Sequence, residues 1–168
     1  MRPLLVLVGP PGAGKSTVGR LAAELLDVGF RDTDLDIVRA VGKPISEVFG
    51  DEGEDHFRAL ERDAVATALA EHDGVLSLGG GAVLDADTRQ LLSDHHVVLL
   101  DADLGAAAGR VGMGQGRPLI ALNPRAQLRQ LLQERRPLYL EVAREVVDTS
   151  ALTPMQVVEQ VVALASRP

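Results

Sequence analysis

The sequence contains no cysteine and very few aromatic residues, and each absence excludes a group of functions. Without a thiol the chain can form no disulfide, thiolate zinc site, redox centre or cysteine nucleophile, which is compatible with a reducing cytoplasm. Aromatic residues make up 2% of the 168 residues, so stacking against a ligand would have to come mostly from arginine, proline or aliphatic side chains. The net charge of −7 argues against a general nucleic-acid-binding protein.

Long hydrophobic runs are also missing. The first apolar run, in "MRPLLVLVGPPG", is interrupted by glycine and proline after five or six residues. It is too short to span a bilayer and carries no signal-peptide cleavage pattern. Hydrophobic residues nevertheless make up 46% of the sequence, which is enough for a packed core. We therefore expect a cytoplasmic protein whose residues 1–168 form a single domain.

Short apolar runs alternate with longer segments of helical periodicity. This alternation predicts an α/β protein with a parallel sheet covered on both faces. The predicted strands are Leu4–Val8, Phe30–Asp32, Val75–Leu78, Val97–Asp101 and Glu145–Asp148. The predicted helices lie near Ser16–Leu26, Asp55–Glu71, Asp87–Leu92, Leu104–Arg110, Arg125–Ala143 and Pro154–Ala165. Three glycines in "GMGQGRP", at 112–118, predict a flexible loop.

The segment "GPPGAGKST", at 9–17, matches the pattern G-x-x-x-x-G-K-[ST] at every fixed position. It lies between a predicted strand and a predicted helix, as a phosphate-binding loop must, and this context disfavours a glycine turn that merely caps a helix. Backbone N–H groups of such a loop surround phosphate oxygens, Lys15 reaches the β- and γ-phosphates, and Ser16 can ligate Mg²⁺. The motif indicates a nucleotide but not the phosphate acceptor. An N-K-x-D pattern is absent, so a GTPase is disfavoured.

The acceptor side is indicated first by "FRDTDLD", at 30–36. In an extended segment Asp32 and Asp34 would point to the same side, towards the crevice beside the phosphate loop. One carboxylate could hold a metal-bound water while the other takes a proton. We interpret Asp36, in contrast, as a cap of the following helix.

A second indication is "GVLSLGGGA", in which a buried strand ends in Gly79, Gly80 and Gly81. A glycine-rich turn can present bare N–H groups to an anion. Arg58 and Arg136 could complete such a site around a substrate carboxylate, with Glu61 three residues from Arg58. Either arginine could instead be an ordinary surface residue.

Taken together, these motifs resemble the shikimate kinase family over nearly the whole chain. The resemblance depends on "GPPGAGKST", "DTD" at 32–34, "FR" at 57–58 with Glu61, "GGG" at 79–81, "RP" at 117–118, and an "RxPLY" pattern that runs from Arg135 or Arg136 to Tyr139. It implies phosphorylation of the 3-hydroxyl of shikimate by ATP and Mg²⁺, on the path to chorismate and the aromatic amino acids. It also implies a P-loop α/β/α fold like that of the nucleoside monophosphate kinases, with five parallel strands in the order 2-3-1-4-5.

The resemblance further implies roles for individual residues. Asp34 would bind shikimate and act as the base, and Asp32 with Ser16 would support Mg²⁺. The substrate site would comprise Asp34, Phe49, Phe57, Arg58, Glu61, Gly80, Gly81 and Arg136, within a helical region at about 33–61. ATP would contact Gly12, Ala13, Gly14, Lys15, Ser16, Thr17, Arg110, Arg117 and Pro118, with Arg117 reaching the transferring phosphate from a lid at about 112–124.

Two departures accompany the resemblance. The third strand carries Ser77 where a Walker B motif has an acidic residue, so Mg²⁺ would depend on Ser16, phosphates and waters. The loop "DTSALTP" lacks the basic residue or asparagine that many relatives place near the adenine. A gluconate kinase, a silent nucleotide-binding module and a nucleic-acid-binding ATPase are the alternatives. We expect a monomer that binds a small molecule and neither nucleic acid nor membrane.

Overall fold

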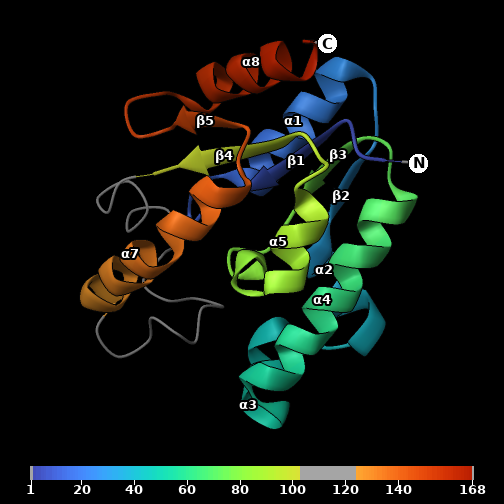
Figure 1. The fold of residues 1–168 in the computed structure, drawn as a ribbon, viewed down its shortest axis with the longest axis vertical. Coiled ribbons are helices and arrows are strands. Elements are labelled where there is room, and N and C mark those ends of the chain that lie inside the picture. Colours follow the sequence, from blue (N-terminus) through green and yellow to red (C-terminus); the bar gives the residue numbers. More distant parts are fainter. Residues whose placement is uncertain (1, 103–123, 168) are drawn as a thin grey trace.

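The computed structural model describes residues 2–102 and 124–167. A parallel sheet of five strands, ordered β2-β3-β1-β4-β5, forms its centre (Figure 1). The strands are β1 Leu5–Val8, β2 Phe30–Asp32, β3 Val75–Ser77, β4 Val97–Asp101 and β5 Glu145–Asp148. In the central register, Val6 lies beside Leu76 of β3 and Val97 of β4. The predicted fold class and strand order are confirmed.

The helices differ from the prediction mainly between β2 and β3. They are α1 Lys15–Leu26, α2 Thr33–Val41, α3 Ile45–Glu52, α4 Glu54–Glu71, α5 Ala86–Leu92, α7 Pro124–Val142 and α8 Pro154–Ala165, with a 3-10 turn η1 at Ala82–Leu84. The sequence predicted a helical region near 33–61 without separating α2 and α3. The helix predicted at Leu104–Arg110 lies outside the described residues. Among the described helices, none combines the length and apolar character that crossing a membrane would require.

Two hydrophobic layers cover the sheet, because successive strand residues point to opposite faces. Leu5 and Leu7 of β1 face α1 and α8, whereas Val6 and Val8 face α4, α5 and part of α7. Figure 1 shows α1 and α8 on one side of the sheet and α4 and α5 on the other. Helix α7 contributes to both layers, with Leu128 in the first and Tyr139 in the second.

Helices α2, α3 and α4 enclose a smaller core of their own. Ile37, Val48 and Phe57 are buried there, with Phe49 packed against them. Helix α2 begins after its N-cap Asp32 and ends at Gly42, whose φ of 76° is the left-handed conformation that commonly ends a helix. Helix α3 and the start of α4 lie beyond the end of the sheet (Figure 1).

Candidate active site

The phosphate-loop sequence joins β1 to the N-terminus of α1. Gly14 is the N-cap of α1 and has a φ of 88°, which a residue with a Cβ would adopt only with strain. The ammonium of Lys15 donates to the carbonyl oxygens of Gly9, at 2.7 Å, and Pro10, at 3.0 Å. The loop is therefore closed around its own lysine, and it leads into the N-terminus of α1, a position that favours anions.

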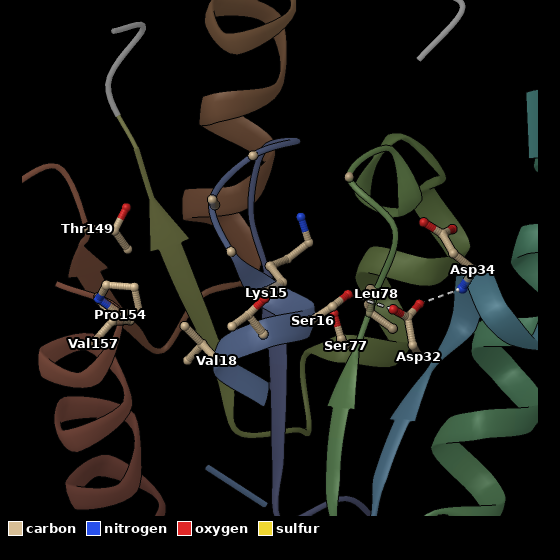
Figure 2. A pocket seen from close by; sticks show the side chains of 15 residues that line it. Lys15, Ser16, Val18, Asp32, Asp34, Ser77, Leu78, Thr149, Pro154 and Val157 are labelled. Carbon is tan, nitrogen blue, oxygen red and sulfur yellow. Dashed lines mark hydrogen bonds between the residues drawn. The ribbon is translucent and has the colours of Figure 1, made fainter. Parts of the chain in front are cut away.

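A cavity of about 400 Å³ opens over this loop at the carboxyl edge of the sheet. Thr149, Pro154 and Val157 form one end of it, and Asp32 and Asp34 form the other (Figure 2). The full lining is Gly12, Ala13, Gly14, Lys15, Ser16, Thr17, Val18, Asp32, Asp34, Ser77, Leu78, Gly80, Thr149, Pro154 and Val157. Ligands of open α/β sheets occupy this edge.

Asp32 connects the phosphate loop to α2. One of its carboxylate oxygens accepts the Ser16 hydroxyl at 2.8 Å, and the other accepts the N–H of Asp34 at 2.9 Å. Asp32, not Asp36, is thus the helix cap, which corrects our interpretation. Asp36 instead accepts a hydrogen bond from Nε of Arg31 at 2.7 Å. Asp34 lies in the first turn of α2 and not in an extended segment as expected, but it still lines the cavity.

The residues proposed for magnesium can be compared with this geometry. Ser16 and Asp32 present a hydroxyl and a carboxylate beside the loop, which are oxygen ligands of the kind that Mg²⁺ prefers. Within 2–102 and 124–167, no group of three or more histidine, cysteine, aspartate or glutamate side chains could hold a metal by itself. The donors therefore fit an ion whose remaining ligands are phosphates and waters. Such an ion does not need the acidic Walker B residue that Ser77 replaces.

The three glycines allow charged side chains to approach the backbone after β3. A methyl group on Gly79 would lie 2.6 Å from Oδ1 of Asp34 and 2.8 Å from Oε2 of Glu61. A methyl group on Gly81 would lie 2.6 Å from Nη2 of Arg58. Real Cβ atoms do not approach other atoms so closely, so the acidic and basic groups occupy the space that side chains would otherwise fill.

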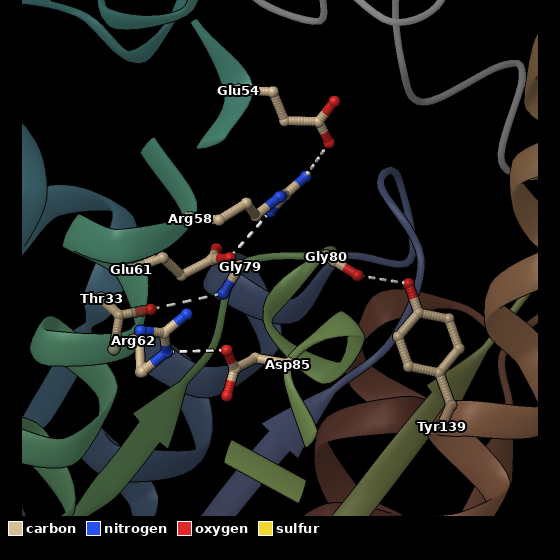
Figure 3. Close-up of polar contacts among 9 residues, drawn as sticks. All are labelled: Thr33, Glu54, Arg58, Glu61, Arg62, Gly79, Gly80, Asp85 and Tyr139. Carbon is tan, nitrogen blue, oxygen red and sulfur yellow. Dashed lines mark hydrogen bonds and ion pairs between the residues drawn. The ribbon is translucent and has the colours of Figure 1, made fainter. Parts of the chain in front are cut away.

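The backbone groups of this glycine turn are all hydrogen-bonded within the described residues except for two N–H groups. The Gly79 N–H donates to Thr33 Oγ1 at 3.3 Å, and the Gly79 carbonyl accepts from the Ala82 N–H. The Gly80 carbonyl accepts from the Tyr139 hydroxyl at 2.6 Å (Figure 3), and the Gly81 carbonyl accepts from the Leu84 N–H. Across the described part of the chain, the N–H groups of Gly80 and Gly81 have no hydrogen-bond partner. Such donors normally find a partner, so this pair is suited to an anion.

Arg58 lies over the glycine turn and is held from several directions. Its Nη1 is 2.7 Å from Oε1 of Glu61, and its Nη2 is 3.5 Å from Oε1 of Glu54 (Figure 3). The guanidinium carbon is 5.8 Å from the ring centroid of Phe49 and 5.2 Å from that of Phe57. The two rings therefore support the arginine, and its buried Nε atom has no partner among the described residues. The cation is positioned with hydrogen-bonding capacity remaining.

Glu61 is a buried carboxyl between opposing charges. Burial raises the pKa of Glu61 above its usual value, the Arg58 guanidinium acts in the opposite direction, and the nearby Asp34 carboxylate raises it further. Arg135 also lowers the Glu61 pKa, which places a second guanidinium beside this group. Two acidic and two basic side chains therefore meet at the glycine turn.

The structure brings Arg135, and not Arg136, to this cluster. Arg135 is 6% exposed, and its charge favours the ionised forms of both Glu61 and Tyr139. The Arg136 side chain is 58% exposed, and its Nη1 lies 2.8 Å from Oδ2 of Asp101 at the end of β4. Consecutive helical residues point about 100° apart, so only one of them can face the glycines. The four-residue spacing between Arg135 and Tyr139 is the sequence signal that identifies it.

Thr33 and Tyr139 hold the glycine turn through their hydroxyl groups. Both belong to motifs of the family resemblance, "DTD" and "RxPLY", but the sequence indicated no role for either side chain. The predicted contacts at Arg110, Arg117 and Pro118, and the predicted lid up to residue 123, lie outside the described residues. Pro124, the last residue of the predicted lid, is the first of α7.

A phosphate loop and an acceptor-side cluster at one edge of a 2-3-1-4-5 sheet define a P-loop kinase of the nucleoside monophosphate kinase-like type. The family model described as "Shikimate kinase" matches residues 11–166. A shikimate kinase from Salinispora tropica is 62% identical over 164 residues, which are 98% of each chain. The chain belongs to the shikimate kinase family.

Solved structures agree with this assignment. The structure of "Shikimate kinase from Acinetobacter baumannii in complex with shikimate" aligns with a TM-score of 0.92 and 37% identity, covering 98% of this chain and 92% of that one. A gluconokinase from Sinorhizobium meliloti aligns with a TM-score of 0.60 and 22% identity, covering 97% of this chain and 91% of that one, and it shares the fold alone.

Proposed function

We propose that this protein transfers the γ-phosphoryl group of ATP to the 3-hydroxyl of shikimate, the reaction of its family. The observation that carries this proposal is the anion site beside the phosphate loop. Two guanidinium groups and two N–H groups without partners among the described residues converge at the glycine turn, at the same sheet edge as Lys15. A small hydroxy acid that placed its carboxylate there would direct a hydroxyl towards the phosphate loop.

On the nucleotide side, residues 12–17 would surround the phosphates, with Lys15 neutralising the charge that develops on the transferring group. This requires Lys15 to leave the loop carbonyls that hold it, at 2.7 and 3.0 Å, and to bind phosphate oxygens instead. Ser16 and Asp32 would hold Mg²⁺, Asp32 through its hydrogen bond to Ser16. Bound Mg²⁺ would supply charge neutralisation at the phosphates.

On the acceptor side, Arg58, Arg135 and the Gly80 and Gly81 amides bind the carboxylate by charge-assisted hydrogen bonds. Arg135 replaces Arg136 in this proposal because only Arg135 faces the cluster. Asp34 contacts the substrate hydroxyls and takes the proton of the attacking one. Glu61 orients Arg58, and the guanidinium of Arg58 lies over the rings of Phe49 and Phe57.

The same proposal includes a division of the single domain into a substrate-binding region at about 33–61 and a lid at about 112–124. The shared small core of α2, α3 and α4 supports the first of these. Arg117 would reach the transferring phosphate, and Arg110 with Pro118 would flank the adenine. We further propose that the enzyme is a cytoplasmic monomer.

Steady-state phosphorylation assays test the function directly. ATP and Mg²⁺ are supplied with shikimate, gluconate or a nucleoside monophosphate, and the phosphorylated product is identified by ³¹P NMR. We expect turnover with shikimate alone. Turnover of gluconate with none of shikimate would overturn the substrate assignment but keep the kinase, whereas the absence of turnover with every acceptor would overturn both.

A further inference from the structure

The hydroxyl of Tyr139 is a buried polar group in contact with the glycine turn. It lies on α7, 59 residues from Gly80, and its side chain is 2% exposed. The hydroxyl donates to the Gly80 carbonyl at 2.6 Å and is also in hydrogen-bonding contact with the side chain of Arg135, one turn earlier on α7. A buried hydroxyl needs a partner, and this one has a partner within its own helix as well as one on the turn. Its contact with a turn at the candidate substrate site suggests a role beyond packing.

The geometry of the peptide group relates this contact to the anion site. All described peptide bonds are trans, so the carbonyl of Gly80 and the N–H of Gly81 point in opposite directions within one plane. When the Tyr139 hydroxyl holds the carbonyl on one side, the Gly81 N–H must face the other. Gly81 is also the residue over which the Arg58 guanidinium lies.

The neighbouring donor is oriented differently. The Gly80 N–H shares a peptide with the Gly79 carbonyl, which accepts from Ala82, only three residues away, at 3.1 Å. The local turn therefore suffices to orient the Gly80 N–H. The Gly81 N–H depends on a side chain from a distant helix, and no other hydrogen bond among the described residues holds its peptide at the carbonyl end.

We propose that Tyr139 is a positioning residue for substrate binding, which holds the Gly80–Gly81 peptide so that the Gly81 N–H points at the substrate carboxylate. The inference depends on the proposed function, because it requires an acid substrate at the glycine turn. Tyr139 does not touch the substrate and acts through this peptide, beside its contact with Arg135. Burial raises the pKa of Tyr139 to about 12, so its hydroxyl remains a donor throughout the range in which kinases are assayed.

The test compares two substrates and two variants. Tyr139→Phe removes the hydroxyl and keeps the ring, and the methyl ester of shikimate keeps the substrate's shape but removes its negative charge. We expect Tyr139→Phe to raise KM for shikimate about 3- to 10-fold, the loss typical of one hydrogen bond, with little change in kcat. The same variant should change kcat/KM for the ester less than twofold, because the ester has no carboxylate for the amide to bind.

The matched control is Val142→Ala, on the same helix and in the same hydrophobic layer. It creates a cavity and lowers Tm, but it leaves the ratio of acid to ester activity unchanged. Equal losses of acid and ester activity in Tyr139→Phe, or no loss of either, would overturn the inference while wild-type turnover of shikimate upheld the proposed function. A wild-type enzyme that does not phosphorylate shikimate would instead remove the function on which the inference depends.

A spectroscopic measurement applies even if Tyr139→Phe does not fold. Tyr139 is the only tyrosine, and the sequence has no tryptophan, so tyrosine absorbance reports this one hydroxyl. A carboxylate bound to the Gly81 N–H polarises the peptide and strengthens the bond that its carbonyl accepts. Shikimate should therefore shift the tyrosine absorption band of the wild-type protein to longer wavelength, whereas the methyl ester should not. An identical spectrum with and without shikimate would contradict the proposal.

Discussion

The phosphate loop and the acceptor cluster lie at the same edge of the sheet, but they are built in opposite ways. The loop is one continuous segment, residues 9–17, and its own backbone forms the site. The cluster combines the start of α2, one face of α4, the turn after β3 and one face of α7 (Figure 3). A site made from one segment depends on local geometry, whereas a site made from four depends on the packing that brings them together.

The largest expected effect is on kcat and comes from Asp34, which lies between the phosphate loop and the acceptor cluster. Asp34→Asn should lower kcat by about 10²- to 10⁴-fold, because the amide keeps hydrogen bonds but cannot take the proton. The measurement is kcat at saturating ATP and shikimate. A variant that changed only KM would show Asp34 to be a binding residue without a role as a base.

Within the phosphate loop, Lys15→Ala should lower kcat by about 10²- to 10³-fold through loss of charge stabilisation on the transferring group. The circular dichroism spectrum and Tm should remain close to those of the wild type, because the Lys15 bonds to the Gly9 and Pro10 carbonyls are only partly buried. Near-normal kcat in a folded variant would show that this loop is not the phosphate site.

In the acceptor cluster, Arg135→Ala and Arg136→Ala form a matched pair of adjacent arginines. Arg135→Ala should weaken shikimate binding by about 1.5–3 kcal/mol, the value of a hydrogen bond to a charged group, and ATP binding much less. Arg136→Ala removes an ion pair with Asp101 from a largely exposed side chain, so its effect should be about 0–1 kcal/mol. Isothermal titration with each ligand separates them, and the reverse order would return the assignment to Arg136.

The glycine turn provides a second matched pair. A methyl group at Gly81 meets the Arg58 guanidinium, whereas one at Gly80 meets only Pro11, whose Cδ is 3.2 Å away. We expect Gly81→Ala to raise the Kd for shikimate about 10-fold by displacing Arg58, and Gly80→Ala to raise it less. Equal effects would mean that crowding of the amides, and not displacement of Arg58, limits binding.

The smallest expected effect is on stability. Because burial raises the pKa of Glu61, the folded protein holds this proton more tightly than the unfolded chain. The stability that Glu61 contributes is therefore present at low pH and is lost as the pH rises above its ordinary value of 4.5. The free energy of unfolding is measured in urea at several pH values for the wild type and for Glu61→Gln. As the pH rises above 4.5, the wild type should lose stability relative to Glu61→Gln. A difference that instead favoured the wild type at higher pH would show that pairing with Arg58 outweighs burial.

Most elements of the fold could be predicted from the sequence alone, because their signals are local. The five strands, the phosphate loop and the long helices were predicted nearly to their ends, because hydrophobic periodicity and the glycine-lysine spacing are properties of consecutive residues. Asp34, Arg58, Glu61 and the three glycines were identified through a family pattern of the same kind.

Packing between distant segments decided which arginine of the adjacent pair faces the site. It also decided which hydroxyl groups hold the glycine turn. The choice between Arg135 and Arg136 depends on the rotation of α7 about its axis, and that rotation is set by the burial of Leu128 and Tyr139 against the sheet. Thr33 meets the glycines because β2 and β3 are neighbours, and Tyr139 meets them because α7 packs beside the end of β3. Contacts between segments so distant in sequence follow from packing, which no local pattern encodes.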